Sequence, residues 1–227
     1  MSVLVRERIG AIEEVLAAGP ILVLAPHPDD ESLGCGMLLA AAFRGSGAVV
    51  AAMTDGEGSH PALPATRVKR VRGLELQRAV MELGGKPCDI VRLGLPDAGS
   101  PDIDEVSRAE RRLRGLVTRH QVSALFVASA DDPHCDHQLA NRIARDVQAR
   151  CAGLRLFEYA IWARWRGHRV DGVTFNRADL RAAKKRAIKS HGSQQGRSLR
   201  CANSFTFPKG FASFFAGQPE VFSEVVA

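Results

Sequence analysis

The sequence of 227 residues lacks any long apolar run, since no stretch approaches the roughly 18 to 20 continuous apolar residues that a membrane-spanning helix needs. Its first residues, MSVLVRERIGAIEEVL, mix charged and apolar side chains and do not have the pattern of a secretory signal. We therefore expect a soluble, cytoplasmic protein without stable membrane insertion.

The sequence also lacks a cysteine framework and a recognisable nucleic-acid-binding motif. Its five cysteines are an odd number without CxxC spacing, which argues against disulfides and against a structural zinc knuckle. Lys and Arg number 31 and Asp and Glu 25, so the formal net charge of +6 favours anionic partners. Aromatic residues make up only 6% of the chain, and we expect no nucleic acid among those partners.

Buried strands and amphipathic helices alternate along the chain. Apolar runs predict strands over residues 21–25, 48–54, 89–95, 122–129 and 154–162. Helical spacing predicts helices over residues 3–17, 32–44, 66–83, 104–120 and 136–151. The alternation predicts an α/β fold: a Rossmann-like three-layer sandwich with a mainly parallel sheet and helices on both faces. We expect one domain over residues 1–227, with the C-terminal tail 196–227 packed on it.

Two clusters of acids and histidines follow predicted strands. HPDDE (27–31) follows the run ILVLA with one proline between, and DDPHCDH (131–137) follows LFVAS with one alanine between. Parallel sheets bind ligands at the carboxyl ends of their strands. An isolated histidine or acid near a strand end is usually a cap or a surface group, but two such clusters at equivalent places predict a site.

The spacing within the clusters suits a metal ion. His27 and Asp30 are three residues apart, and His134 and His137 repeat that interval. Two imidazole nitrogens and one carboxylate oxygen form the three-ligand set of catalytic zinc, which leaves a fourth position for water or substrate.

The other polar residues of the two clusters are candidates for catalytic roles next to such a metal ion. Asp29 neighbours a ligand and is a candidate general base for water. The histidine of the later pair that does not bind metal can stabilise an oxyanion or protonate a leaving amine, with Asp136 orienting its ring. These residues indicate a metal-dependent hydrolase without naming the bond that it cleaves.

At this point the sequence resembles the PIG-L/LmbE-like family of zinc-dependent N-deacetylases. The resemblance rests on HPDDE followed by LGCG and later by HCDH, and it covers about residues 20–195. Further segments in the family's order are TDGE, the stretch from Arg72 to Glu75 with Leu83-Gly84 downstream, LGLPDAG, EYAIW and KKRAIKSHGSQ.

The resemblance implies a role for each matching position. His27, Asp30 and His137 are similar to the zinc ligands, and Asp29 is similar to the general base. It implies that His134 stabilises the tetrahedral oxyanion with the support of Asp136. Arg72 and Asp97 match positions that contact the sugar in relatives, although Arg72 could equally pair with Glu75 along its own helix.

Two residues depart from the family pattern. Cys135 stands where the family often has proline, and Met37 replaces the last glycine of a common CGG. Neither change removes a proposed ligand, and the spacing assigns metal binding to His137 rather than to Cys135. Cys35 is expected to pack as a small apolar side chain.

The resemblance predicts hydrolysis of the acetyl group of an N-acetylated amino-sugar conjugate by zinc-activated water. The expected partner is therefore an N-acetylated amino-sugar conjugate, which can be anionic or neutral. The metal can be zinc or another divalent ion, and the protein can form a homo-oligomer. The alternatives are another metal-dependent amidohydrolase or phosphoesterase, a non-catalytic sugar-binding relative and a basic nucleic-acid-binding protein. A two-metal phosphoesterase would bind two ions rather than one.

Three further segments have open roles. The basic run 177–189 is typical of the solvated face of a helix, with anion binding as the alternative. The aromatic stretch FTFPKGFASFF is expected to form core or a dimer contact rather than a membrane surface. His60 and His191 are candidates for the pocket rim, although His60 lies in the polar loop GEGSHPALP, where an exposed histidine is expected.

Overall fold

A seven-stranded sheet with the order β3-β2-β1-β4-β5-β7-β6 forms the centre of the computed structural model, which describes residues 11–225. The strands are β1 (Ile21–Ala25), β2 (Ala48–Thr54), β3 (Ile90–Leu95), β4 (Ala124–Ala128), β5 (Arg155–Tyr159), β6 (Val173–Phe175) and β7 (Glu220–Val225). The first five strands are parallel, whereas β7 runs antiparallel to both of its neighbours, β5 and β6.

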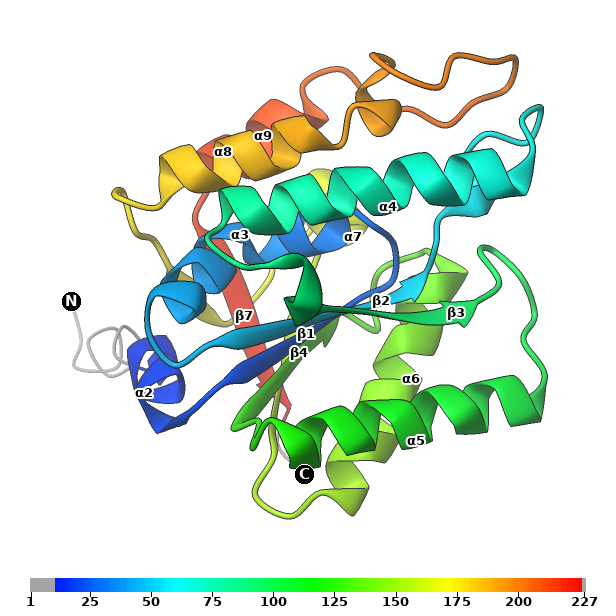
Figure 1. The fold of residues 1–227 in the computed structure, drawn as a ribbon. Coiled ribbons are helices and arrows are strands. Elements are labelled where there is room, and N and C mark those ends of the chain that lie inside the picture. The colour runs from blue at the N-terminus through cyan, green and yellow to red at the C-terminus, as the bar shows by residue number, and fades with distance from the viewer. Residues whose placement is uncertain (1–10, 226–227) are drawn as a thin grey trace.

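Helices cover both faces of this sheet (Figure 1). The helices are α2 (Ala11–Ala18), α3 (Asp30–Arg44), α4 (Ala65–Glu82), α5 (Ile103–Arg119), α6 (Cys135–Arg150), α7 (Trp162–Trp165), α8 (Arg181–Ser190) and α9 (Phe211–Gly217). Three short 3₁₀ helices are η1 (Glu57–Ser59), η2 (Pro87–Asp89) and η3 (Ser193–Gln195). Helices α3, α4, α8 and α9 lie over one face and α5 and α6 over the other (Figure 1), so the predicted three-layer α/β fold is confirmed. No helix within residues 11–225 is long and apolar enough to cross a bilayer.

The alternation of side chains along each strand builds a separate core on each face. In β1, Ile21 and Val23 belong to the cluster under α3 and α4, and Leu22 and Leu24 belong to the cluster under α5 and α6. All five residues of β1 are buried, which explains why the strand is an uninterrupted apolar run.

The chain order reverses between β1 and β4, which lie side by side. From β1 the parallel strands continue through β2 to β3 on one side, and from β4 they continue to β5 on the other. The loops that follow β1 and β4 therefore diverge from each other and leave a crevice at their carboxyl ends. Both polar clusters begin in these two loops, so the topology brings them together.

Helix α3, which begins within the polar cluster that follows β1, contains a kink. The backbone at Cys35 is not helical (φ −128°, ψ 16°), which leaves the amides after it without their usual helical acceptors. Glu220 of β7 fills this role, since its Oε1 accepts a hydrogen bond from the amide of Met37 at 2.7 Å and its Oε2 accepts one from Leu38 at 2.9 Å. Lys184 of α8 neutralises the same carboxylate at 2.8 Å. A member of the predicted solvated basic run is thus fully buried and belongs to the structural core.

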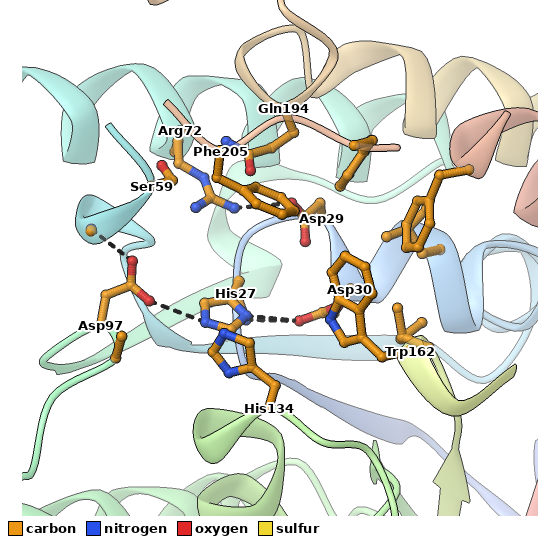
Figure 2. Close-up of a pocket in the computed structure, with 16 residues that line it drawn as sticks. His27, Asp29, Asp30, Ser59, Arg72, Asp97, His134, Trp162, Gln194 and Phe205 are labelled. Atoms are coloured by element: carbon orange, nitrogen blue, oxygen red, sulfur yellow. Dashed lines mark hydrogen bonds and ion pairs between the residues drawn. The ribbon is translucent and has the colours of Figure 1, made fainter. Parts of the chain in front are cut away.

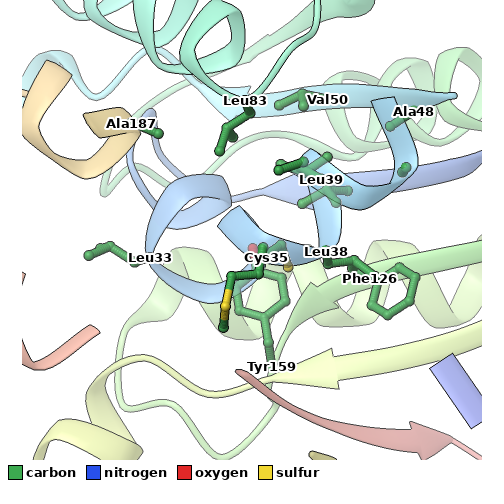
Figure 3. Close-up of a cluster of buried hydrophobic side chains, with 14 of the residues drawn as sticks. Leu33, Cys35, Leu38, Leu39, Ala48, Val50, Leu83, Phe126, Tyr159 and Ala187 are labelled. Carbon is green, nitrogen blue, oxygen red and sulfur yellow. The ribbon is translucent and has the colours of Figure 1, made fainter. Parts of the chain in front are cut away.

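The two glycines around this kink are required by close contacts. A Cβ atom at Gly34 would lie 2.3 Å from a ring carbon of Tyr159, and one at Gly36 would lie 2.7 Å from Lys184. Figure 3 shows Tyr159 beneath the helix beside Cys35, which is buried in the core as expected. The segment LGCG therefore allows α3 to lie directly on β5 and α8.

Candidate metal centre and pocket

His27 and Asp30 form the first part of a candidate metal centre. His27 lies in the loop after β1, and Asp30 is the first residue of α3. The Asp30 Oδ2 atom accepts a hydrogen bond from the His27 amide at 3.1 Å and lies 3.3 Å from His27 Nδ1. The short turn between strand and helix therefore directs both side chains to one point.

His137 reaches the same point from α6. Its Nε2 atom lies 3.3 Å from Asp30 Oδ2, is buried, and has no hydrogen-bond partner. Its Nδ1 atom lies 2.8 Å from Asp132 Oδ2 and donates a hydrogen bond to it, which directs Nε2 toward Asp30. A buried imidazole nitrogen beside a carboxylate and a second imidazole, with an orienting carboxylate behind it, is the arrangement of a metal ligand.

The donor atoms of His27, Asp30 and His137 all lie within 4.8 Å of one another, which fits a single ion. A second set, His27, His134 and Asp136, meets the same distance criterion. In that set, however, His134 Nδ1 already accepts a hydrogen bond from the amide of Asp136 at 3.2 Å. The first set is therefore the better metal site, because its His137 nitrogen is otherwise unsatisfied.

Asp132 is fully buried and holds the His137 ring through contacts that the sequence did not reveal. It also accepts hydrogen bonds from the amides of Ile161 at 3.0 Å and Ala163 at 2.8 Å. Burial lowers the pKa of His137, but Asp30 and Asp132 outweigh it and raise this pKa to about 9. The segment after β5 thus fixes the orientation of a candidate ligand on α6.

The other ring nitrogen of His27 contacts two acids. His27 Nε2 lies 2.9 Å from Asp136 Oδ2 and 3.1 Å from Asp97 Oδ1. Burial lowers the pKa of His27, but its hydrogen bonds to Asp136, Asp30 and Asp97 outweigh burial and raise it well above the ordinary value. The carboxylate of Asp136 lies farther from His134, at 3.9 Å from Nδ1, so in this structure it orients His27 directly.

Asp29 lies beside this set in a strained backbone conformation. Its φ of 146° is rare for a residue other than glycine, and its amide donates a hydrogen bond to Glu31 Oε2 at 2.8 Å. Its Oδ2 atom accepts a hydrogen bond from Arg72 at 2.9 Å. Burial raises the pKa of Asp29 to about 7, with Arg72 opposing and Asp30 reinforcing the rise. A carboxylate with such a pKa is suited to accept and return a proton near neutral pH.

His134 caps α6 and faces the pocket. Its Nδ1 atom accepts the hydrogen bond from the amide of Asp136, so the proton of the neutral ring resides on Nε2. Burial, together with the charges of His27 and His137, lowers the pKa of His134. The ring is therefore neutral near pH 7 and can donate a hydrogen bond from Nε2.

Arg72 and Asp97 both line the pocket. Arg72 is buried, and it donates hydrogen bonds to the carbonyls of Gly56 and Pro28 as well as to Asp29. It does not pair with Glu75, whose carboxylate instead accepts hydrogen bonds from Ser193 and Ser198. Asp97 Oδ2 accepts a hydrogen bond from the amide of Gly58 at 2.7 Å.

These residues surround a pocket of about 200 Å³. Figure 2 shows Asp97 and Arg72 on one side of His27 and Trp162 on the other. The polar lining consists of Ser59, Arg72, Asp97 and Gln194. The apolar lining consists of Leu33, Ile161, Trp162, Phe205, Phe207 and Phe211, and Phe205 lies beside Arg72 and Gln194 (Figure 2). The pocket therefore offers hydrogen bonds and an apolar surface to different parts of one ligand.

Two histidines lie elsewhere than expected. His60 was expected to be exposed in its loop, and this expectation is wrong because the residue is fully buried, with Nδ1 2.9 Å from Ser59 Oγ. His191, a candidate for the rim, is buried with Nε2 2.9 Å from Glu31 Oε1. Burial lowers the pKa of His191, but Glu31 outweighs it and raises this pKa. Glu31 in turn supports Asp29, so His191 acts behind the pocket.

Comparison with known proteins gives this pocket a context. The profile of the PIG-L family, described as GlcNAc-PI de-N-acetylase, matches residues 22–148, which include every metal-set residue. The chain belongs to the PIG-L family. This PIG-L chain resembles the conserved protein TT1542 from Thermus thermophilus (26% identity, TM-score 0.67), with 91% of this chain and 94% of that chain covered. No curated protein sequence matches it.

Two further structures share the fold at lower identity. The N,N'-diacetylchitobiose deacetylase of Pyrococcus horikoshii has 19% identity and a TM-score of 0.71, covering 99% of this chain and 94% of its own. GalB, the 4-carboxy-2-hydroxymuconate hydratase of Pseudomonas putida, has 15% identity and a TM-score of 0.66, covering 92% and 97%. The match to the PIG-L family supports a deacetylase, whereas these two structures show only that the fold is shared, in one case by a hydratase.

Proposed function

We propose that this PIG-L protein is a zinc-dependent hydrolase that removes the acetyl group from an N-acetylated amino sugar. The observation that carries the proposal is the buried, unpartnered Nε2 atom of His137, directed by Asp132 toward His27 and Asp30. A zinc ion held by these three residues would supply a Lewis acid for the acetyl carbonyl and for water.

The chain's own residues account for the proton transfers. Asp29, with a pKa of about 7, accepts a proton from the attacking water as its oxygen bonds to the carbonyl carbon. The Nε2 proton of His134 forms a hydrogen bond to the oxyanion that develops. The C–N bond then breaks, Asp29 returns its proton to the nitrogen, and an amine and acetate leave.

The polar lining of the pocket supports an amino sugar as the substrate. Asp97 and Gln194 offer hydrogen-bond groups to ring hydroxyls, and Arg72 supports Asp29 through a hydrogen bond. Asp97 carries its charge at low pH, since His27 and Arg72 outweigh burial and hold its pKa well below the ordinary value. A charged carboxylate accepts hydrogen bonds from two neighbouring hydroxyls.

The test is an assay of the zinc-loaded protein with a panel of N-acetylglucosamine conjugates. Free amine and acetate should appear in equal amounts, and acetate must be measured because a hydratase would release none. Asp29→Asn should bind zinc as the wild type does and lose about 10²- to 10⁴-fold in kcat. Asp104→Asn, which alters an exposed acid of α5, serves as the control.

Two results would refute the proposal. An Asp29→Asn variant with wild-type turnover would remove the base assignment. A metal content of two ions per chain with release of phosphate from a phosphomonoester would favour the two-metal phosphoesterase.

A further inference from the structure

Four aromatic side chains form a connected surface in the pocket, here named the aromatic wall: Trp162, Phe205, Phe207 and Phe211. Neighbouring ring centroids lie 5.9 Å apart for Trp162 and Phe205, and 6.3 Å apart for Phe205 and Phe207. They lie 5.0 Å apart for Phe207 and Phe211, and 4.9 Å apart for Trp162 and Phe211. Each ring thus contacts two others, and together they form an apolar cup rather than one flat platform.

Backbone hydrogen bonds hold the aromatic wall in place across the pocket. The amide of Phe205 donates to the carbonyl of Ser59 at 2.7 Å, and the amide of Phe207 donates to the carbonyl of Gln194 at 2.7 Å. Ser59 and Gln194 both belong to the polar lining. The segment that carries Phe205 and Phe207 is therefore anchored to two residues that line the same pocket.

The aromatic wall leaves apolar surface in contact with water. Phe205 is 40% exposed although its backbone is anchored, whereas Phe211 is fully buried. Part of the Phe-rich tail thus forms core, as expected, while Phe205 projects into the pocket instead. Exposed aromatic surface inside a concave site gains stabilisation only when an apolar group covers it.

The aromatic wall lines the same pocket as His27 and Asp30 of the candidate metal set. Trp162 directly follows Ile161, whose amide binds the same Asp132 oxygen that holds His137. The backbone before Trp162 is thus linked to His137 through Asp132, and an amide held at the metal set shares its pocket with the aromatic wall. Asp97 and Gln194 offer hydrogen-bond groups to sugar hydroxyls in the same pocket, whereas the aromatic wall offers only apolar surface, which suits an apolar part of the substrate.

We propose that the aromatic wall is a subsite for an apolar substituent carried directly by the amino sugar. The inference rests on the proposed function and names its substrate class as an amphipathic amino-sugar conjugate. The apolar group has two possible attachments, since it can be the aglycone on the sugar oxygen or an acyl chain longer than acetyl on the nitrogen. Stacking of the sugar ring itself on Trp162 is the competing role of the aromatic wall.

A binding experiment without hydrolysis tests the subsite independently of the enzyme activity. The full-length protein is titrated by ligand-observed NMR with hexyl β-D-glucopyranoside, below its micelle concentration, and with methyl β-D-glucopyranoside. We expect the hexyl glycoside to bind at least about tenfold more tightly, because each fully buried methylene contributes about fourfold. Equal affinity of the two glycosides would overturn the subsite and would support sugar stacking.

Variants of the aromatic wall show which residues cause the preference for the hexyl glycoside over the methyl glycoside. Phe205→Ala should lower the ratio of the two affinities, and Phe205→Leu, which keeps apolar bulk, should retain most of it. Met81→Ala removes another exposed apolar side chain, 58% exposed on α4 and outside the pocket, and should leave the ratio unchanged. A ratio that survives Phe205→Ala and also Phe207→Ala would place the apolar group elsewhere and overturn the proposal.

Turnover then distinguishes the two attachments. The zinc-loaded protein is assayed with hexyl N-acetyl-β-D-glucosaminide, methyl N-hexanoyl-β-D-glucosaminide and methyl N-acetyl-β-D-glucosaminide. A gain in kcat/KM of about tenfold for the first identifies an apolar aglycone, and the same gain for the second identifies a longer acyl chain. Turnover of all three at equal efficiency overturns the subsite, while tight hexyl binding with no turnover overturns the deacetylase proposal alone.

Discussion

Replacement of Asp132 tests the candidate metal centre most directly, because this residue acts only through others. Its carboxylate accepts hydrogen bonds from the Ile161 and Ala163 amides and orients His137 through Nδ1. Asp132→Ala leaves two buried amides without acceptors, which costs about 1–3 kcal/mol each and so about 2–6 kcal/mol of unfolding free energy. Loss of a carboxylate that orients a histidine ligand typically lowers metal affinity about 10- to 100-fold.

Asp132→Asn removes the negative charge of the side chain but keeps its size and shape. An asparagine oxygen at the Oδ2 position keeps the hydrogen bonds to His137 and Ile161, but its amide group then opposes the donor of Ala163. We expect a loss of unfolding free energy of about 1–3 kcal/mol and a drop in zinc affinity of about tenfold, because the neutral amide polarises His137 less.

Zinc affinity is measured by competition with a chromophoric chelator, and stability by urea unfolding. Asp131→Asn changes the exposed neighbouring acid and should alter neither quantity. If folded Asp132→Asn and Asp132→Ala both bound zinc as the wild type does, His137 would not be a ligand held by Asp132. If Asp132→Ala does not fold, the zinc affinity of Asp132→Asn alone tests whether Asp132 holds His137 as a ligand.

Two further changes test the support of the site. Glu31→Gln should lower kcat about tenfold at unchanged zinc affinity, because a charge-assisted hydrogen bond to the amide of Asp29 becomes a neutral one. Glu14→Gln is the control. A normal kcat of Glu31→Gln would contradict this role of Glu31. Gly34→Ala should lower the unfolding free energy by about 1–3 kcal/mol, because the added methyl group clashes with Tyr159. Gly115→Ala has open space around its Cβ and should raise the unfolding free energy by about 0.5–1 kcal/mol. Urea unfolding measures both changes, and equal effects of the two variants would refute the packing explanation.

Local pattern was enough to predict the parallel part of the sheet. The predicted strands 21–25 and 48–54 coincide with β1 and β2, because fully buried strands are continuous apolar runs. The antiparallel strands β6 and β7 were not predicted, since β6 has three residues and β7 is only partly buried. Their strand conformation depends on the pairing of β7 with β5 and of β6 with β7, which no local signal records. The predicted helix 3–17 is helical over Ala11–Ala18, and its first residues lie outside the part that the structure describes.

The site was predictable where it depends on strand ends. The structure brings His27, Asp30 and His137 together because β1 and β4 are neighbours, and their metal-binding role stays a prediction. Asp132 and Glu31 stand in the quoted motifs, but their partners come from Ile161, Ala163 and His191, far along the chain. Contacts between residues so distant in sequence depend on tertiary packing, which one sequence without relatives does not reveal.

The carboxylate of Glu220, which stabilises α3, is synthesised long after this helix. It stabilises the kinked helix that carries Asp30 from a position 183 residues after Met37, and every residue of the metal set leaves the ribosome before it does. A nascent chain that stalls ahead of β7 therefore holds Asp30 on a helix with unsatisfied amides. We expect the candidate metal set to reach its final geometry only after this late strand has docked.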